Sequence, residues 1–252
     1  MIKTVILDLD GTLYLGEKGI KGADEKLEEL RSKGINIILF TNASTRTTHG
    51  VVGKLRRRGI NVKKEEVYCT SYLIAKFIKK KYPGSKAFII GEYGLKNELA
   101  AVGIKIVEKD ADIVVVGLDR GITYKKLEQA LTELRNGAIL LASNNDPYFP
   151  VEDGLRPGAG AILAAVEKAS GMEPEMIAGK PNTYGFEVIK EEKKIREEET
   201  LVVGDRLDTD ILFAKNCGLK SALVLTGVAK EKDIKEVKPD FVLKSVLDLN
   251  LP

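Results

Sequence analysis

The 252-residue sequence has little of several residue types on which metal and nucleophile chemistry often depends. It contains a single histidine, His49, and two cysteines, Cys69 and Cys217, which lie far apart without metal-type spacing. One histidine cannot build a multi-histidine metal site, so we expect neither zinc chemistry nor histidine-based acyl transfer. We interpret both cysteines as small buried thiols rather than a disulfide or a reactive pair.

The sequence also lacks a long apolar run and a dominant charge. Its longest unbroken apolar stretches, such as 37–40 and 113–116, are far shorter than the ~20 residues that cross a bilayer. Acidic residues interrupt the N-terminal stretch, so we expect no leader, no membrane contact and a cytoplasmic protein. The formal net charge is only +3. The densest basic stretches, 54–58 and 76–81, fall on helical patterns, and we interpret them as solvated faces without a nucleic-acid partner.

What the sequence does have is an alternation of strand-like and helix-like segments. The strand-like segments are β-branched and apolar almost throughout, which is typical of strands buried on both faces. They are 4–7, 35–41, 86–90, 113–117, 138–142, 200–204 and 222–225. Helical patterns include 23–32, 73–80, 124–134 and 208–216. The alternation predicts an α/β fold built on a doubly wound, Rossmann-like parallel sheet.

Polar residues directly follow the strands at the two ends of the chain, whereas strands in the middle end at Gly91 and Gly117. The polar residues are Asp8, Asp10, Thr41, Asn42 and Asp205. Open parallel sheets bind ligands beyond the carboxyl ends of their strands. We therefore predict a discontinuous catalytic core of residues 1–71 and 178–252, with a separate inserted α/β domain at 72–177.

The first motif is Asp8-Leu9-Asp10-Gly11-Thr12. Alternate residues of an extended segment point the same way, so the two carboxylates can reach a common site, and the glycine permits a sharp turn. Neighbouring carboxylates repel each other unless a cation is bound, and Mg²⁺ is the usual hard ion with oxygen ligands. The alternative is a turn in which an aspartate caps the residues that follow.

The second motif covers residues 40–44, Phe-Thr-Asn-Ala-Ser, between a buried strand and a helical stretch. Its hydroxyl, amide and backbone N–H groups are the donors that a phosphate needs, and a helix N-terminus adds partial positive charge. The alternative is an ordinary helix start capped by Ser44 or Thr45.

The third motif is Gly179-Lys180-Pro181-Asn182, placed before an expected proline-started helix. Lys180 could neutralise phosphate charge that builds in a transition state. The alternative is a surface lysine without a chemical role.

The fourth motif runs from Gly204 to Asp210 and contains three aspartates. Asp205 would complete a metal site, while Asp208 or Asp210 would orient the ligands, and the sequence leaves open which of the two does so. The alternative is again a helix cap, with acidic residues in a first turn that the helix dipole favours.

Together, these motifs resemble the haloacid dehalogenase superfamily, in which four motifs follow in this order. The resemblance covers nearly the whole chain and is closest to subfamily IIA, the NagD and p-nitrophenyl phosphatase-like proteins with a C2-type cap. The cap landmarks are similar at residues 116–120, 144–147 and 157–160.

The resemblance implies that Asp8 is the nucleophile and Asp10 the general acid/base. It further implies that Mg²⁺ is held by Asp8, by Asp10 through its carbonyl, and by Asp205. By the same resemblance, the residues that bind and steady the phosphate are Thr41, Asn42, Ala43 and Lys180.

Two positions depart from the family pattern. Many relatives have asparagine at Ala43, so a side-chain contact is absent here although the backbone N–H remains. Pyridoxal-phosphate phosphatases carry a substrate-contacting histidine where this sequence has Phe149, which argues against that substrate. We expect Tyr148 and Phe149 to form the contact loop of the cap.

The expected function is Mg²⁺-dependent hydrolysis of small-molecule phosphate monoesters through an aspartyl phosphate on Asp8. The alternatives are a phosphomutase-type phosphotransferase and a non-catalytic phospho-accepting or metabolite-binding domain. The cap-sized insert and the position of Lys180 argue against a phospho-accepting domain, which needs neither, and the phosphomutase stays open. The sequence does not name the substrate or the oligomeric state, although homodimers are common among the proteins that it resembles.

Overall fold

The computed structural model describes residues 1–151 and 154–251, and its contacts divide the chain into two compact units. The core unit comprises Met1–Thr41, Val51–Tyr68 and Lys180–Pro252. The insert unit comprises Asn42–Gly50 and Cys69–Gly179. The chain thus passes between the units slightly outside the expected limits of 72–177, and a short earlier segment, 42–50, also groups with the insert unit by its contacts.

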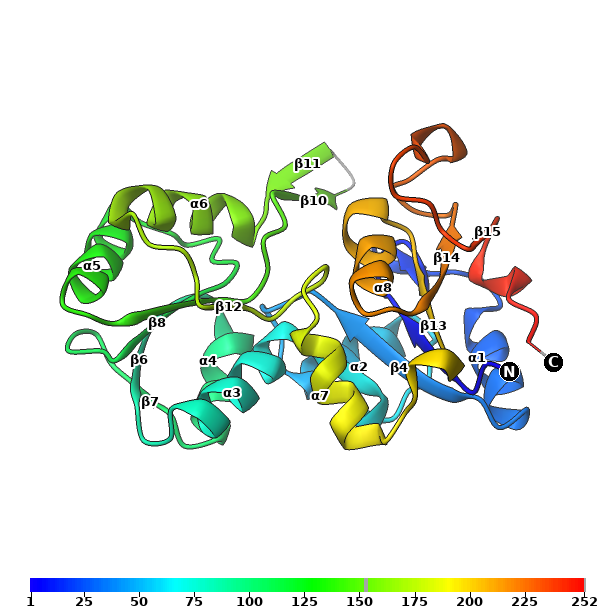
Figure 1. Ribbon diagram of the computed structural model, residues 1–252, viewed down its shortest axis with the longest axis horizontal. Helices are drawn as coiled ribbons and strands as arrows, with labels where there is room; N and C mark the ends of the chain where they lie inside the picture. Colours follow the sequence, from blue (N-terminus) through cyan, green and yellow to red (C-terminus); the bar gives the residue numbers. More distant parts are fainter. Residues whose placement is uncertain (152–153, 252) are drawn as a thin grey trace. The chain divides into compact units, whose positions relative to one another are not determined.

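The core unit is built on a six-stranded sheet (Figure 1). Its strands, in spatial order, are β15 (Phe241–Leu243), β14 (Lys220–Val224), β13 (Thr200–Gly204), β1 (Thr4–Leu7), β4 (Asn36–Thr41) and β5 (Val67–Cys69). The pairings from β15 through β4 are parallel. Every residue of β1 and β13 is buried, as expected for central strands covered on both faces. Their carboxyl ends lie side by side, and this places Asp8 next to Asp205.

The core unit also contains a small hairpin, β2 (Tyr14–Leu15) with β3 (Lys18–Gly19), and several helices. The helices are α1 (Ala23–Ser32), α2 (Thr48–Arg57), which begins in the insert unit, α7 (Tyr184–Lys193) and α8 (Leu212–Asn216). Short helical turns are η1 (Lys64–Glu66), η2 (Glu197–Glu199), η3 (Leu207–Ile211, π-helical), η4 (Glu231–Asp233) and η5 (Val246–Asp248).

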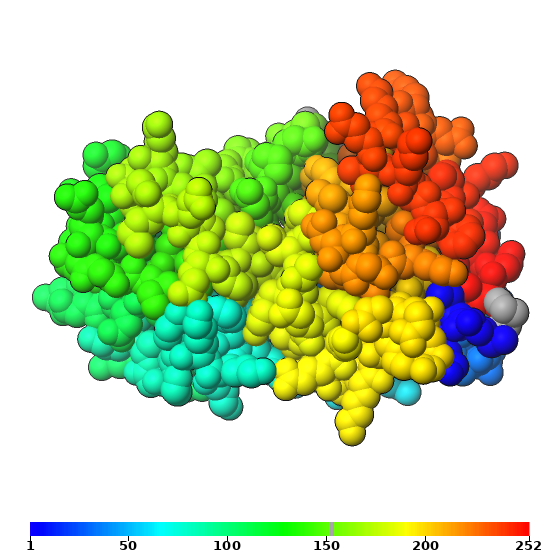
Figure 2. All heavy atoms as spheres, in the orientation of Figure 1, coloured from blue at the N-terminus to red at the C-terminus, as the bar shows by residue number. Residues whose placement is uncertain are grey.

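The C-terminal segment packs on α1 of the core unit (Figures 1 and 2). The Lys26 ammonium donates to the carbonyl of Leu249 at 3.4 Å, and that of Lys33 to the carbonyl of Leu251 at 2.9 Å. These contacts tie the last turn of the chain to the first helix.

The insert unit has its own parallel five-stranded sheet. Its strands, in spatial order, are β12 (Met176–Ile177), β9 (Ile139–Ala142), β8 (Ile113–Val116), β6 (Lys86–Ile90) and β7 (Lys105–Ile106). Its helices are α3 (Thr70–Lys81), α4 (Tyr93–Ala101), α5 (Tyr124–Arg135) and α6 (Ala159–Ser170). An antiparallel hairpin, β10 (Tyr148–Val151) with β11 (Gly154–Pro157), precedes α6.

Alternation along the insert strands explains why this unit has a core of its own. Phe88 and Ile90, Val114 and Val116, and Leu140 and Ala142 point to one face and pack with apolar residues of α5 and α6. Figure 1 shows α3 and α4 on the opposite face of this sheet. The predicted fold class, a doubly wound parallel-sheet core with an inserted α/β domain, is therefore confirmed. Within residues 1–151 and 154–251, none of the helices has the length and apolar character of a transmembrane segment.

Candidate active site

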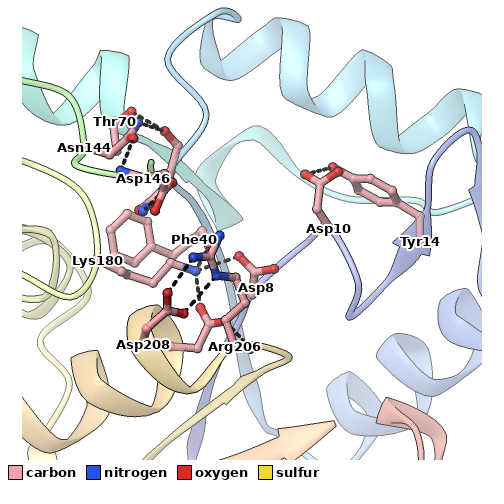
Figure 3. Close-up of polar contacts among 12 residues, drawn as sticks. Asp8, Asp10, Tyr14, Phe40, Thr70, Asn144, Asp146, Lys180, Arg206 and Asp208 are labelled. Carbon is pink, nitrogen blue, oxygen red and sulfur yellow. Dashed lines mark hydrogen bonds and ion pairs between the residues drawn. The ribbon is translucent and has the colours of Figure 1, made fainter. Parts of the chain in front are cut away.

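Asp8 stands directly after β1, and its side chain is 14% exposed. Its backbone N–H donates to the carbonyl of Val203 at 2.9 Å, which continues the parallel ladder with β13 by one residue. The ammonium of Lys180 donates to Asp8 Oδ1 at 2.6 Å and to the carbonyl of Phe40 at 3.0 Å (Figure 3). The strand end thus holds the Asp8 carboxylate in one orientation, beside a buried lysine.

Lys180 also donates to Asp210 Oδ1 at 2.6 Å, so that it bridges two carboxylates. Its side chain is only 3% exposed. Burial alone would lower the pKa of this ammonium, but Asp210 and Asp8 raise it above its usual range. Lys180 therefore stays charged, and the alternative of a surface lysine is wrong. The helix expected to begin at the following proline begins three residues later, at Tyr184.

Asp8, Asp205 and Asp210 each offer one carboxylate oxygen, and these three oxygens lie within 4.8 Å of one another. Burial raises the pKa of the Asp8 carboxyl well above its usual value, and repulsion by the two neighbouring aspartates adds to this against the opposing effect of Lys180. Burial also raises the pKa of Asp205 to about 7, with Asp210 as the next cause. Three clustered carboxylates facing one ammonium leave negative charge in excess, and an all-oxygen donor set of this kind fits Mg²⁺.

Asp205 is held by close backbone approaches that need glycine. A Cβ atom on Gly227 would lie 1.9 Å from Asp205 Oδ2, and one on Gly11 would lie 2.3 Å from the same oxygen. Gly11 also has φ +85°, a conformation that favours glycine. The backbone N–H of Val228 donates to Asp205 Oδ2 at 2.7 Å. The backbone of the first motif and that of the segment after β14 therefore both pack closely against the Asp205 carboxylate.

The structure decides between the two acids of the fourth motif. Asp208 is exposed and forms an ion pair with Arg206 at 2.7 Å, whereas Asp210 is buried and contacts Lys180. A Cβ on Gly204 would lie 2.3 Å from the Cβ of Asp210, so this glycine lets the chain turn back and bring Asp210 beside the strand end. Asp210 is the acid that joins the cluster.

The Asp10 carboxylate lies outside this cluster. Figure 3 shows it directed to the hydroxyl of Tyr14, which donates to Asp10 Oδ2 at 2.5 Å. The Lys54 ammonium donates to the Tyr14 hydroxyl at 2.5 Å and lies 3.4 Å from Asp10 Oδ1. Burial raises the pKa of Tyr14 far above its usual value, and the Asp10 charge adds to this effect. The expectation that the carboxylates of Asp8 and Asp10 share one site is not met in this side-chain conformation.

The basic stretch 54–58 is also more than a solvated face. Arg58 has a side chain that is only 3% exposed, and its guanidinium lies 4.8 Å from the centre of the Tyr14 ring. The Lys54 ammonium lies 4.4 Å from the same ring. Both cations therefore pack on the aromatic ring that contacts Asp10.

Of the residues expected to bind phosphate, Thr41 is the last residue of β4 and is buried in the core unit. Asn42 and Ala43 follow it and group with the insert unit. Ser44 does not cap the next helix, because its hydroxyl accepts the backbone N–H of Leu118 at 3.2 Å. The helix α2 begins only at Thr48.

Sequence reasoning missed Tyr14, Lys54 and the residues around Asn42. Tyr14 follows Asp10 by four residues, and a tyrosine so close to the first motif was an available signal. Lys54 gave no signal beyond its membership of a basic helix. Within the insert unit, Thr70 and Asn144 both donate to the carbonyl of Asn42, and nothing in their local sequence marks this contact.

Comparison with known proteins found matches over nearly the whole chain. A family model described as haloacid dehalogenase-like hydrolase matches residues 5–105, and a HAD-hydrolase-like model matches residues 177–249. An acid sugar phosphatase from Staphylococcus aureus is 38% identical over 98% of this chain and 95% of its own length. The crystal structure of a 4-nitrophenylphosphatase from Thermotoga maritima superposes with TM-score 0.93 and 38% identity, over 97% of this chain and 95% of that chain.

A third relative is a glycerol phosphate phosphatase from Mycobacterium tuberculosis, whose structure is a complex with magnesium. It has TM-score 0.89 and 34% identity, over 97% of this chain and 75% of that chain. The chain belongs to the haloacid dehalogenase-like hydrolase family, and it is a phosphatase. The predicted likeness to NagD and the p-nitrophenyl phosphatases is confirmed.

Proposed function

We propose that the protein is a Mg²⁺-dependent phosphatase that transfers the phosphoryl group of a small phosphate monoester to Asp8 and then to water. The observation that carries this proposal is the position of the Asp8 carboxylate at the end of β1. It is bound by Lys180 and clustered with Asp205 and Asp210 within 4.8 Å. A carboxylate oriented in this way beside fixed positive charge can act as a nucleophile toward phosphorus.

In the first step, an Asp8 carboxylate oxygen forms a bond to phosphorus while the bond to the ester oxygen breaks. Asp10 donates a proton to the departing alkoxide, which requires its carboxylate to turn from the Tyr14 hydroxyl. In the second step, Asp10 accepts a proton from the attacking water, and the acyl phosphate bond breaks to release phosphate and free Asp8. Lys180 and the donors of Thr41, Asn42 and Ala43 bind the phosphate oxygens throughout.

Asp8, Asp205 and the backbone carbonyl of Asp10 would hold the magnesium ion, with Asp210 orienting the carboxylates and Lys180. When bound, Mg²⁺ supplies positive charge that offsets the charge of the three carboxylates and of the phosphate. The magnesium complex of the mycobacterial glycerol phosphate phosphatase supports this choice of ion.

The names of the relatives suggest the substrate class. Sugar phosphates and glycerol phosphate follow from two of these names, and 4-nitrophenyl phosphate from the third. We therefore propose phosphate monoesters of sugars and small polyols as substrates. Tyr148 and Phe149 lie on the hairpin β10–β11 of the insert unit, and their contribution to the choice of leaving group stays a prediction.

The test is hydrolysis of a panel of phosphate esters by the wild type, by Asp8→Asn and by Asp208→Asn. Loss of the nucleophile should lower kcat by roughly 10⁴-fold or more. Asp208→Asn removes an exposed carboxylate paired with Arg206 and should keep activity. Hydroxylamine trapping should label Asp8 in the wild type and in Asp208→Asn, and should give no label at this position in Asp8→Asn. Chelation should stop turnover, and Mg²⁺ should restore it. Near-wild-type turnover by Asp8→Asn, or full activity after exhaustive chelation, would refute the proposal.

A further inference from the structure

The backbone carbonyl of Asn42 accepts two side-chain hydrogen bonds within the insert unit. The hydroxyl of Thr70, the first residue of α3, donates to it at 2.8 Å. The amide of Asn144, two residues beyond β9, donates to it at the same distance. Thr70 is fully buried and Asn144 is 4% exposed. A carbonyl oxygen has two lone pairs, so these donors occupy both.

Binding the carbonyl also fixes the amide on the other side of the same peptide. The Asn42–Ala43 bond is trans, because within residues 1–151 and 154–251 the cis bond is at Lys180-Pro181. In a planar trans peptide, the C=O and N–H groups point in opposite directions. Once Thr70 and Asn144 hold the Asn42 carbonyl, the direction of the Ala43 N–H is set as well. Ala43 has no polar side chain, so this backbone N–H is the donor that the position can offer to an anion.

Further contacts hold the donors in place. Asn144 Oδ1 accepts the backbone N–H of Asp146 at 3.0 Å, and the Asn42 side chain donates to Asp146 Oδ2 at 3.1 Å. Figure 3 shows Thr70, Asn144 and Asp146 gathered at one place. A Cβ on Gly179 would lie 2.7 Å from Asn42 Oδ1 and 2.8 Å from Asn144 Cβ, so the cluster is closed on that side by backbone.

We propose that Thr70 and Asn144 are positioning residues for phosphate binding, which they serve by fixing the Asn42–Ala43 peptide so that its N–H meets a phosphate oxygen. This inference rests on the proposed function, because it takes the second motif as the phosphate-binding segment. The two residues touch neither substrate nor metal. Their effect is on how well the amide is oriented before the phosphate arrives.

The matched pair Thr70→Val and Thr70→Ser separates orientation from packing. Valine keeps the shape of threonine and loses the O–H donor, while serine keeps the donor and loses a methyl group. Loss of one orienting hydrogen bond should raise the Ki of inorganic phosphate about fivefold in Thr70→Val. Thr70→Ser should stay near the wild type. A backbone contact made in both ground and transition states should raise KM similarly and leave kcat within about twofold.

Asn144→Asp provides a second, independent variant. It keeps the acceptor for the Asp146 N–H but replaces the donor with an oxygen that repels the Asn42 carbonyl, so its Ki should rise more than that of Thr70→Val. The matched control is Thr132→Val in α5, whose hydroxyl donates to the Glu128 carbonyl at 3.0 Å. Its Ki should not change.

The measurements are competition of inorganic phosphate against 4-nitrophenyl phosphate and direct calorimetric binding of phosphate, both on the full Mg²⁺-loaded chain. An unchanged phosphate affinity in Thr70→Val, or equal losses in Thr70→Val and Thr70→Ser, overturns the inference. A wild type that binds no phosphate also overturns it. Failure of the proposed function has a different signature: Asp8→Asn would turn over substrate while the phosphate affinities of the Thr70 pair still differ.

Discussion

At the scale of single residues, the carboxylates around Lys180 carry excess negative charge. This excess favours a bound cation, and in its absence Asp205 can hold a proton. In the metal-free protein, Asp205 has a pKa of about 7, raised from its usual 3.8 by burial and by the nearby Asp210. A carboxyl with a raised pKa still holds its proton below neutral pH. A metal ion needs the ionised form and must displace that proton.

We therefore predict that Mg²⁺ binding releases protons at about pH 6 and that the release from Asp205 declines toward about pH 8.5. The sign follows from the direction of the shift, since below the raised pKa the metal-free folded protein carries the extra proton. Calorimetry in buffers of different ionisation enthalpy measures the release. Asp208→Asn should behave as the wild type. A binding enthalpy that does not depend on the buffer at pH 6 would contradict the prediction.

At the scale of elements, glycines decide how the strand-end loops approach the acids. A Cβ on Gly227 would meet Asp205 Oδ2 at 1.9 Å, a separation that no side-chain adjustment of a buried aspartate can relieve. By contrast, a Cβ on Gly53 in the middle of α2 would meet only the Arg57 guanidinium, at 3.6 Å.

Gly227→Ala should therefore lower Mg²⁺ affinity by roughly tenfold or more, because it displaces a carboxylate of the metal cluster. Gly53→Ala is the matched control and should raise the free energy of unfolding by about 0.5–1 kcal/mol without changing metal affinity. Mg²⁺ titration of activity and urea unfolding give the two quantities. Equal metal affinity in both variants would show that Gly227 is not needed for the position of Asp205.

The elements themselves were largely predictable from the sequence. β1, β6, β13 and α1 have the bounds that the apolar patterns predicted, since strands buried on both faces read as unbroken apolar runs. The start of α2 was not predictable in this way. Ser44 has the chemistry of a helix cap, but a tertiary contact to Leu118 uses its hydroxyl instead.

Some residues of the candidate site were likewise predictable from the sequence, and others were not. Asp8, Asp205 and Lys180 could be named from the sequence because two of them follow buried strands and the third completes a motif. Tyr14, which contacts Asp10 from four residues away, was within reach of sequence reasoning, whereas the contacts of Thr70 and Asn144 with Asn42 were not. These tertiary contacts depend on where separate segments of the chain meet. Local patterns of polar and apolar residues do not predict such meeting points.

At the scale of the whole molecule, the chain has two cores, and the carboxylate cluster of Asp8, Asp205 and Asp210 lies entirely in one of them. A ligand stabilises the structure that binds it by mass action. Local opening near the cluster should therefore become rarer when the ion is present, while opening elsewhere need not change.

We predict that Mg²⁺ slows amide hydrogen exchange in β1, in β13 and in η3 of the core unit, with little effect on β8 and β9 of the insert unit. Exchange measured by mass spectrometry with and without the ion tests this. Asp205→Asn should lose the protection. Protection that is equal in both units, or confined to the insert unit, would place the ion elsewhere.

The grouping of Asn42–Gly50 with the insert unit bears on how such enzymes can be recombined. A chimera that exchanges only Cys69–Gly179 for the corresponding part of a relative keeps the host's Asn42 but brings in foreign partners for its carbonyl. A chimera must therefore exchange both segments of the insert unit, Asn42–Gly50 and Cys69–Gly179. The shorter segment directly follows a strand of the host's core sheet in the sequence. Grafts that carry both segments should inherit phosphate affinity from the donor of these segments, not from the donor of the nucleophile.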